Sequence, residues 1–310
     1  MKPVQKQLDA SPAFPFSFVY RDTKTRQREL PDHLHDWHEF VYVHSGQGAF
    51  FIDRTIYEMR AGDLFLIPAN TIHRAHPDAV DPVTSTAVFF NPMLVPMQSL
   101  GEPFSYMECF ERSRHKRTYV IKCSDMLRTV LEQGLTEIHD ELQASAPGMR
   151  HAVSLLLQRI LLFIGREIGT EHPTPSQMLS PVFGPAWIRD ALLYIDGHYT
   201  EDIGLSDLSK RAAVSPAHFS RVFKQLTGMN VTGFIVAKRI VKAKELLLAS
   251  DRNVAVIASE CGFENMPHFH RLFKRLAGQT PAAYRRKNTH SRINIKGAIP
   301  SGMPLTNFLR

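Results

Sequence analysis

Two short stretches of the chain have nearly the same sequence, 50 residues apart. Residues 218–228 are HFSRVFKQLTG and residues 268–278 are HFHRLFKRLAG, with seven of eleven positions identical. In each copy the apolar residues recur at i, i+3, i+4 and i+7, the spacing of one face of an α-helix. The chain is therefore predicted to contain two amphipathic helices that bury the same apolar face and expose a basic one. The predicted buried residues are Phe219, Val222, Phe223, Leu226, Phe269, Leu272, Phe273 and Leu276.

Each copy is preceded by a short helical stretch and a turn. Residues 205–214 (LSDLSKRAAV) lead to Ser215 and Pro216, which suit the cap and the first turn of a helix. Residues 254–263 (VAVIASECGF) lead to the second copy, with Gly262 placed for the turn. Helix, tight turn and a second helix with a basic outer face form a helix-turn-helix unit. The similarity continues past both helices, so we predict that a whole unit is repeated.

The stretch between the two units is predicted to be one helix. Residues 231–250 would form a helix ~30 Å long, close to the ~34 Å of one turn of B-DNA. A connector of that length would let the two units enter successive major grooves on one face of a duplex.

Charge is unevenly distributed along the chain. Residues 186–290 contain 16 Lys and Arg against 9 Asp and Glu, whereas residues 1–185 carry a net charge of −3. This asymmetry favours contact with a polyanion at the carboxyl-terminal end only, although a solvated basic surface would have the same composition. The sequence has no run of ~18 apolar residues, no secretion signal at its start and no CxxC pair, so a cytoplasmic location without a membrane anchor is expected.

The amino-terminal part is predicted to consist mainly of strands. Short apolar runs rich in β-branched and aromatic residues alternate with turn signals from residue 14 to about 92, which is typical of a β-barrel or sandwich. Helical spacing follows at 124–143, with Ser124 as cap, and at 149–168. Residues 169–185 contain four prolines and are predicted to be a linker.

These patterns predict an α+β protein of two domains. A strand-rich barrel with two helices would occupy residues 1–168, and an all-helical domain with two helix-turn-helix units would occupy 186–287. Residues 288–310 would form a loose tail.

The carboxyl-terminal part resembles the DNA-binding domain of the AraC/XylS regulators. Residues 257–286 carry that family's pattern of IA, GF, FxRxFKxxxGxTPxxYR almost unbroken, whereas the first unit departs from it at Ser209 and Val231. The resemblance implies base contacts near the start and middle of each recognition helix, with Arg221 and Arg271 suited to bidentate binding of guanine. The implied base-contacting residues are Ala217, Ser220, Arg221, Pro267, His268 and Arg271, and phosphate contacts are expected from Lys224, Lys238, Lys274 and Arg275.

Residues 33–90 resemble a cupin barrel. The spacings His33-x-His35-x3-Glu39-x6-Gly46 and Gly62-x5-Pro68-x4-His73 follow the two cupin motifs, whose histidines and glutamate bind a metal in metal-containing members. Two departures weaken the metal interpretation: Gln27 stands where a glycine is expected, and Asn70 replaces another. We expect no metal; if one binds, its ligands would be His33, His35, Glu39 and His73. The effector site is predicted to draw on His33, His35, Trp37, Glu39 and His73. A sugar would suit this aromatic and polar set, and a purely structural role remains open.

The chain is thus predicted to be a transcriptional regulator without catalytic residues or cofactors. Its expected partners are promoter DNA, a small-molecule effector, RNA polymerase and a second copy of itself, paired through helices in 124–168. The resemblance favours activation. Two alternatives stay open at this point: a metal-binding cupin enzyme fused to a DNA-binding module, and an architectural DNA-binding protein without an effector.

Overall fold

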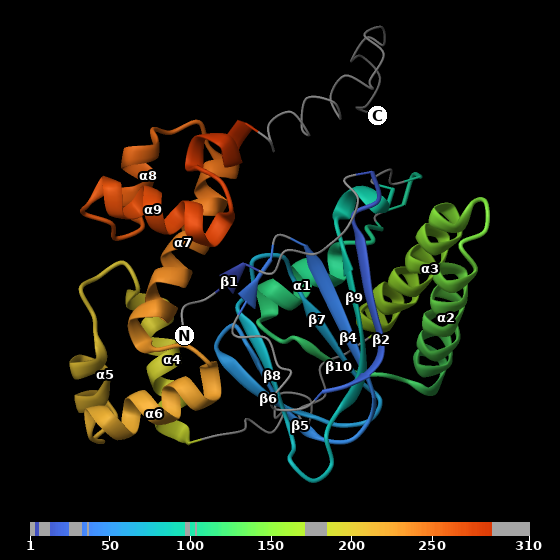
Figure 1. Cartoon of the computed structure of the whole chain (residues 1–310), viewed down its shortest axis with the longest axis horizontal. Coiled ribbons are helices and arrows are strands. Elements are labelled where there is room, and N and C mark those ends of the chain that lie inside the picture. Colours follow the sequence, from blue (N-terminus) through green and yellow to red (C-terminus); the bar gives the residue numbers. More distant parts are fainter. Residues whose placement is uncertain are drawn as a thin grey trace, which may run out of the picture. The chain divides into compact units, whose positions relative to one another are not determined.

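The structure is a computed structural model that describes residues 4–5, 13–24, 33–35, 37–96, 100–102, 104–170 and 185–286. Strands dominate the first part of the chain and helices the second (Figure 1). By its contacts the chain divides into two compact units, Met1–Gly197 with Gly204–Gly233, and His198–Ile203 with Phe234–Arg310. The predicted linker lies outside the described residues from 171 to 184, and the predicted tail 288–310 lies wholly outside them.

The strands form two five-stranded sheets. The first has the order β1 (Val4–Gln5), β3 (His33–Leu34), β8 (His73–Pro77), β5 (Gly48–Ile52) and β6 (Thr55–Met59). The second has the order β10 (Val120–Lys122), β7 (Asp63–Ile67), β4 (His38–Ser45), β9 (Thr84–Phe90) and β2 (Phe16–Thr23). Pairing is antiparallel except between β1 and β3. The prediction of a strand-rich amino-terminal part, expected as a barrel or sandwich, is confirmed, and its strands divide into these two sheets.

Strand β4 is buried on both faces and separates two apolar cores. Val41 and Val43 point into a core that both sheets share, together with residues such as Phe50 and Phe65. The alternate residues Phe40 and Tyr42 point into the second core, which also contains residues of the following helices. Because successive side chains of a strand point to opposite faces, one strand supplies both cores.

Within the described residues up to 170, the α-helices are α1 (Glu108–Lys116), α2 (Asp125–Ala144) and α3 (Met149–Thr170), and a single 3-10 turn spans Pro92–Leu94. The second and third begin within one residue of their predicted starts. Ser124 caps α2 by accepting a hydrogen bond from the Leu127 N–H, as predicted. Helix α1 was not predicted, because among its nine residues only Cys109, Phe110 and Ser113 are buried, too few for a recognisable apolar stripe.

The last third of the described chain is helical, as predicted. Its helices are α4 (Ala186–His198), α5 (Leu205–Arg211), α6 (Pro216–Thr227), α7 (Val231–Ala249), α8 (Val254–Glu260) and α9 (Met266–Ala277). Of the eight residues predicted to be buried in α6 and α9, only Val222 is half-buried and the rest are buried. Helices α5 and α8 end earlier than predicted, because Ala213 and Gly262 soon follow with left-handed φ angles of 53° and 80°. Among the described residues, no helix is long and apolar enough to cross a membrane.

The glycine of the first cupin-like motif gives a testable packing prediction. Gly46 has φ +76°, and a Cβ there would lie 2.2 Å from the Pro82 carbonyl oxygen. Gly148 has a similar φ of +88°, but a Cβ there would meet nothing within 4 Å. We expect Gly46→Ala to lower the free energy of unfolding by about 1–3 kcal/mol more than Gly148→Ala does, because only the first adds a clash to the backbone strain. Urea denaturation of the full chain measures both losses, and equal losses would contradict this packing.

Candidate functional site

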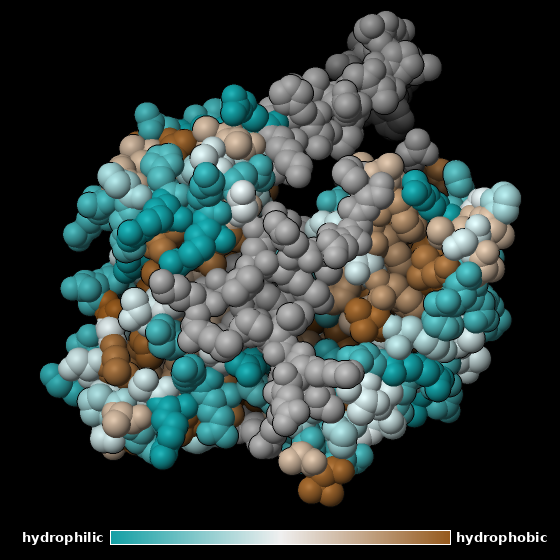
Figure 2. Space-filling view, in the orientation of Figure 1, coloured by the Kyte–Doolittle hydropathy of each residue, from teal (hydrophilic) through white to brown (hydrophobic). Residues whose placement is uncertain are grey.

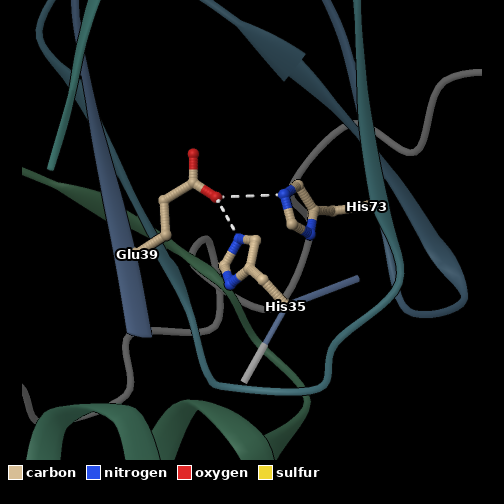
Figure 3. Close-up of side chains that lie close together, drawn as sticks. All are labelled: His35, Glu39 and His73. Atoms are coloured by element: carbon tan, nitrogen blue, oxygen red, sulfur yellow. Dashed lines mark hydrogen bonds and ion pairs between the residues drawn. The ribbon is translucent and has the colours of Figure 1, made fainter. Parts of the chain in front are cut away.

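A buried cluster of three polar side chains joins the two sheets. Glu39 lies on β4 of the second sheet, His73 begins β8 of the first, and His35 lies in the short segment between β3 and β4 (Figure 3). All three residues are buried, with exposed fractions of 2–4%. Nε2 of His35 and Nε2 of His73 each lie 3.0 Å from the same carboxylate oxygen, Oε2 of Glu39.

Backbone carbonyls fix the orientation of both imidazole rings. Nδ1 of His35 lies 2.8 Å from the Trp37 carbonyl oxygen, and Nδ1 of His73 lies 2.9 Å from that of Thr71. A carbonyl oxygen carries no proton, so each Nδ1 must be the donor. In a neutral ring the Nε2 atom then presents a lone pair. The carboxylate and both Nε2 atoms would repel one another unless protons or a cation lay between them.

Electrostatics favour an ionised carboxylate in this cluster. Burial by itself raises the pKa of Glu39, but the charge of His73 and hydrogen bonds from both imidazoles hold that pKa well below its usual value. Burial lowers the pKa of His35, against the opposing effect of Glu39. An anionic oxygen with nitrogen lone pairs is a donor set that suits a divalent metal ion, and His ligands in metal sites commonly donate their other N–H to a backbone carbonyl. The residues present therefore fit a metal.

The other two residues predicted for this site, His33 and Trp37, are not part of the three-residue cluster among the described side chains. The backbone of His33 lies opposite His73 in the antiparallel pair of β3 and β8, but its side chain lies outside the described part of the structure. Trp37 is half-buried and packs against the core shared by the two sheets. Among the described residues, the groups that come within metal-binding distance are His35, Glu39 and His73.

Asn70, which departs from the cupin motif, adopts the left-handed backbone conformation that favours the expected glycine. Its φ is +62°, in the left-handed region that asparagine tolerates better than most residues. Its N–H donates a hydrogen bond of 2.8 Å to the His35 carbonyl oxygen. The departure therefore preserves the loop that carries the cluster.

Sequence reasoning missed the aromatic residues around the cluster. The ring of Phe89 on β9 lies 5.4 Å from that of His35, and the ring of Phe50 on β5 lies 6.2 Å from that of His73. His38 is close in sequence but belongs to the opposite face of β4, where it packs against Phe110. Burial, with Arg114 and His35 nearby, lowers the pKa of His38 to about 3, so its imidazole is neutral.

The two basic helices share the same local construction. Ser215 caps α6 and Asn265 caps α9, each accepting a hydrogen bond from the N–H of the histidine three residues on. Each helix has a proline in its first turn and a glycine with positive φ at its end, Gly228 and Gly278. These signals fix both helices at twelve residues.

Most of the predicted DNA-contacting residues lie exposed on these helices. Nine of the predicted base or phosphate contacts lie on α6 and α9, and all but the half-buried Ser220 are exposed. The eight exposed residues are Ala217, Arg221, Lys224, Pro267, His268, Arg271, Lys274 and Arg275. Lys238, on α7, is also half-buried. The Arg221 guanidinium lies 3.1 Å from His218 Nδ1, one helical turn earlier. Both helices therefore expose basic and polar side chains opposite their buried apolar face.

Comparisons with known families match both parts of the chain. A family model described as an AraC-like ligand binding domain matches residues 15–161, which include the His35, Glu39 and His73 cluster. A model described as a helix-turn-helix domain matches residues 208–287, which include α6 to α9.

Individual relatives match part or most of the chain. The regulatory protein PocR of Salmonella typhimurium is 32% identical over 154 residues, 47% of this chain and 50% of PocR, so the match spans about half of that relative. The HTH-type transcriptional activator RhaS of Pectobacterium carotovorum is 22% identical over 85% of this chain and 90% of its own length. Among solved structures, the C-terminal domain of the response regulator AraT from Geobacillus stearothermophilus is 32% identical over 33% of this chain and 86% of its own. Its TM-score of 0.32 does not establish a shared fold.

Proposed function

Since the chain belongs to the AraC family of transcriptional regulators, we propose that it binds promoter DNA through α6 and α9 and responds to a small molecule held by its strand-rich part. The observation that carries this proposal is the repeated exposed face of the two helices. Each of these helices exposes an arginine and a lysine at the same two positions, Arg221 and Lys224 on α6 and Arg271 and Lys274 on α9.

The exposed side chains divide into two groups by chemistry. Arg221 and Arg271 lie in the middle of their helices and can bind guanine through two parallel hydrogen bonds, which read sequence. Ala217 and Pro267 are apolar, so a thymine methyl is the base group that they can contact. The expected phosphate contacts, which position the protein without reading sequence, come from the exposed Lys224, Lys274 and Arg275 and from Lys238, which is half-buried.

Selection of DNA from a random pool by the full chain tests this function. The expected enriched sequences contain two blocks of specified bases about one helical turn apart, one block for each helix. An architectural DNA-binding protein would instead enrich no sequence and would keep nearly the same affinity for random DNA. Recovery of random sequence would therefore contradict specific regulation.

The effector site is proposed around the buried cluster. His35, Glu39 and His73 provide hydrogen-bonding groups. Trp37, which lies between His35 and Glu39 in the sequence and is half-buried, provides an aromatic face of the kind that stacks on sugars. His33 joins the set by its place opposite His73 in the paired strands. A thermal-shift screen of the full chain against a panel of sugars tests the proposal. A rise in melting temperature with one sugar but not its stereoisomers is expected, and no shift with any sugar would remove the sugar version.

A divalent metal ion is the second candidate ligand, favoured by the convergence of two Nε2 atoms and one carboxylate oxygen. His35, Glu39 and His73 would hold it, and their donor types suit Zn²⁺, Ni²⁺, Fe²⁺ or Co²⁺. Two measurements test this: the metal content of protein purified without added metal, and the visible absorption spectrum during titration with Co²⁺. Less than one tenth of an equivalent of metal, with no Co²⁺ band and no effect of EDTA on melting, would remove this candidate.

The enzyme alternative requires more than metal. The family models and the relatives describe regulators and binding domains, and none of them identifies an enzymatic activity. A metal-binding cupin enzyme would hold stoichiometric metal and also convert a substrate. Metal binding without turnover of small organic substrates would assign the cluster to sensing.

We place a homodimer contact on α2 and α3. Met126 on α2 and Leu155 on α3 expose 67% and 66% of their surface, unusually much for such apolar residues. Apolar surface gathers over β2 and α3 in Figure 2. A dimer would let two copies occupy neighbouring operator sites, and contact with RNA polymerase there would give activation. Analytical ultracentrifugation of the full chain tests the dimer, and a monomer at high concentration would contradict it.

A further inference from the structure

One arginine of the long helix α7 binds three backbone carbonyls. Nε of Arg239 donates to the Tyr199 carbonyl oxygen at 2.6 Å, and Nη2 donates to that of Glu201 at 2.8 Å. Nη1 donates to the carbonyl oxygen of Gly262 at 2.7 Å. A guanidinium has five N–H donors in a rigid plane, so it can hold several acceptors at fixed positions at the same time.

The three acceptors belong to two segments that are far apart in sequence. Tyr199 and Glu201 lie in the connection that follows α4 and precedes α5. Gly262 lies in the turn between α8 and α9. Arg239 therefore fastens to α7 both the connection that leads into the first helix-turn-helix unit and the turn of the second. Only Asp202, Ile203 and Gly204 separate Glu201 from the first residue of α5, Leu205.

The two segments are also packed closely against each other. Gly262 has φ +80°, and a Cβ there would lie 2.5 Å from the Thr200 carbonyl oxygen. The guanidinium carbon of Arg239 lies 5.8 Å from the centre of the Phe263 ring, within the range of a cation–π contact. Burial lowers the pKa of Arg239, while Asp202 and Glu264 nearby oppose that effect. The side chain is half-buried among the groups that it holds, unlike a solvated surface arginine.

Comparison of the two repeated units shows that the first has no arginine at the position of Arg239. Ile188, Ala191 and Ile195 are buried along α4 at the spacing of Ile240, Ala243 and Leu247 along α7. This alignment places Trp187 at the position that corresponds to Arg239. Trp187 contacts its recognition helix through an aromatic ring, 5.3 Å from that of Phe219. In the first helix-turn-helix unit this position thus makes an aromatic contact with the recognition helix. In the second, Arg239 makes hydrogen bonds to the turn at Gly262 and also to the connection that precedes α5.

We propose that Arg239 is a positioning residue for DNA recognition: it makes the two helix-turn-helix units bind two half-sites at one fixed spacing. This inference rests on the proposed DNA-binding function. It assigns Arg239 no contact with DNA. The residue acts through the connection at 199–201 and the turn at Gly262, which both accept hydrogen bonds from its guanidinium.

Spacing dependence tests the proposal. Operators obtained by selection with the full wild-type chain are altered by inserting or deleting one base pair between the two blocks, which rotates one block by roughly 34° relative to the other. For the wild type, each change is expected to weaken binding by about tenfold or more. For Arg239→Gln we expect binding at the original spacing to weaken by about tenfold, because three directed hydrogen bonds are lost, and the penalty for altered spacing to fall below about threefold.

Two further variants separate positioning from general stability. Lys242→Gln removes a cation from the same helix whose side chain is 43% exposed and contacts Glu245 at 3.4 Å, and it should keep the wild-type spacing penalty. Arg239→Lys keeps the charge but not the planar set of donors, so it should behave like Arg239→Gln and serves as the test if the glutamine variant does not fold. A variant of Arg239 that weakens binding equally at every spacing would overturn the inference. If the wild type selects no sequence, the proposed function itself fails, which is a separate result.

Discussion

Replacing Arg271 by alanine is expected to weaken binding by ~1–3 kcal/mol, about 5–150-fold, at operators that carry the preferred base opposite α9. The reason is that the Arg271 side chain is exposed in the middle of α9 and presents a planar pair of donors that matches the O6 and N7 atoms of guanine. The loss should vanish at operators that already lack that base. Arg221→Ala should give the same result for the other half of the operator, so the two variants should relax different base positions. Fluorescence anisotropy with single-base operator variants measures both effects.

A phosphate contact gives a different signature and serves as the control. Lys274 is exposed one turn further along α9 and is proposed to meet the DNA backbone. Lys274→Ala should weaken binding to every sequence by the same factor and reduce the slope of log affinity against log salt concentration by about 1. If Arg271→Ala also weakens all sequences equally, then this arginine holds phosphate and the assignment of base reading to it is wrong.

Removal of the Glu39 carboxylate is expected to destabilise the strand-rich part strongly. The side chain is 5% exposed and contacts both imidazoles at 3.0 Å, so Glu39→Ala leaves two oriented, buried rings without their shared acceptor. We expect the free energy of unfolding to fall by ~3–5 kcal/mol, the usual cost of removing one partner from a buried pair. Urea denaturation of the full chain measures the change. The same variant should lose any thermal shift that a sugar or a metal ion produces in the wild type.

Glu58 is the matched control for this measurement. It also lies on a strand and contacts an arginine, Arg60, at 2.6 Å, but its side chain is 34% exposed and that of Arg60 is 69% exposed. Glu58→Ala should change the free energy of unfolding by about 1 kcal/mol or less, because solvent screens an exposed pair. Similar losses for Glu39→Ala and Glu58→Ala would show that the buried cluster is not a stabilising unit.

Strong local patterns in the sequence predicted most of the fold. Helices α6 and α9 were predicted with their caps and buried faces, because Ser215, Pro216 and the repeated apolar spacing act within one segment. The alternation of strands and turns between residues 14 and 92 was predicted for the same reason. Helix α1 has too few buried residues to leave a periodic signal, and the early ends of α5 and α8 depend on single left-handed residues such as Ala213.

The candidate site was partly predictable from the sequence. Motif spacing brought His35, Glu39 and His73 into one predicted set, and the structure brings these three together. The orientation of the two imidazole rings was not predictable, because the backbone carbonyl oxygens of Trp37 and Thr71 fix it. Every residue has such a carbonyl, so the sequence does not show which ones accept a hydrogen bond. The acceptors of Arg239 are backbone carbonyls too, so the sequence of the mostly apolar helix α7 did not indicate its partners. Asn70 was counted as a departure that weakened the metal interpretation, but it adopts the backbone conformation for which glycine was expected.

Hydroxyl-radical footprinting of the full chain on a selected operator tests the central claim most directly, namely that α6 and α9 read two grooves of one duplex. The predicted result is two protected segments on one face of the DNA, about one helical turn apart, with Arg221→Ala weakening protection of one segment and Arg271→Ala that of the other. A single protected segment, or equal loss of both segments in each variant, would contradict the claim.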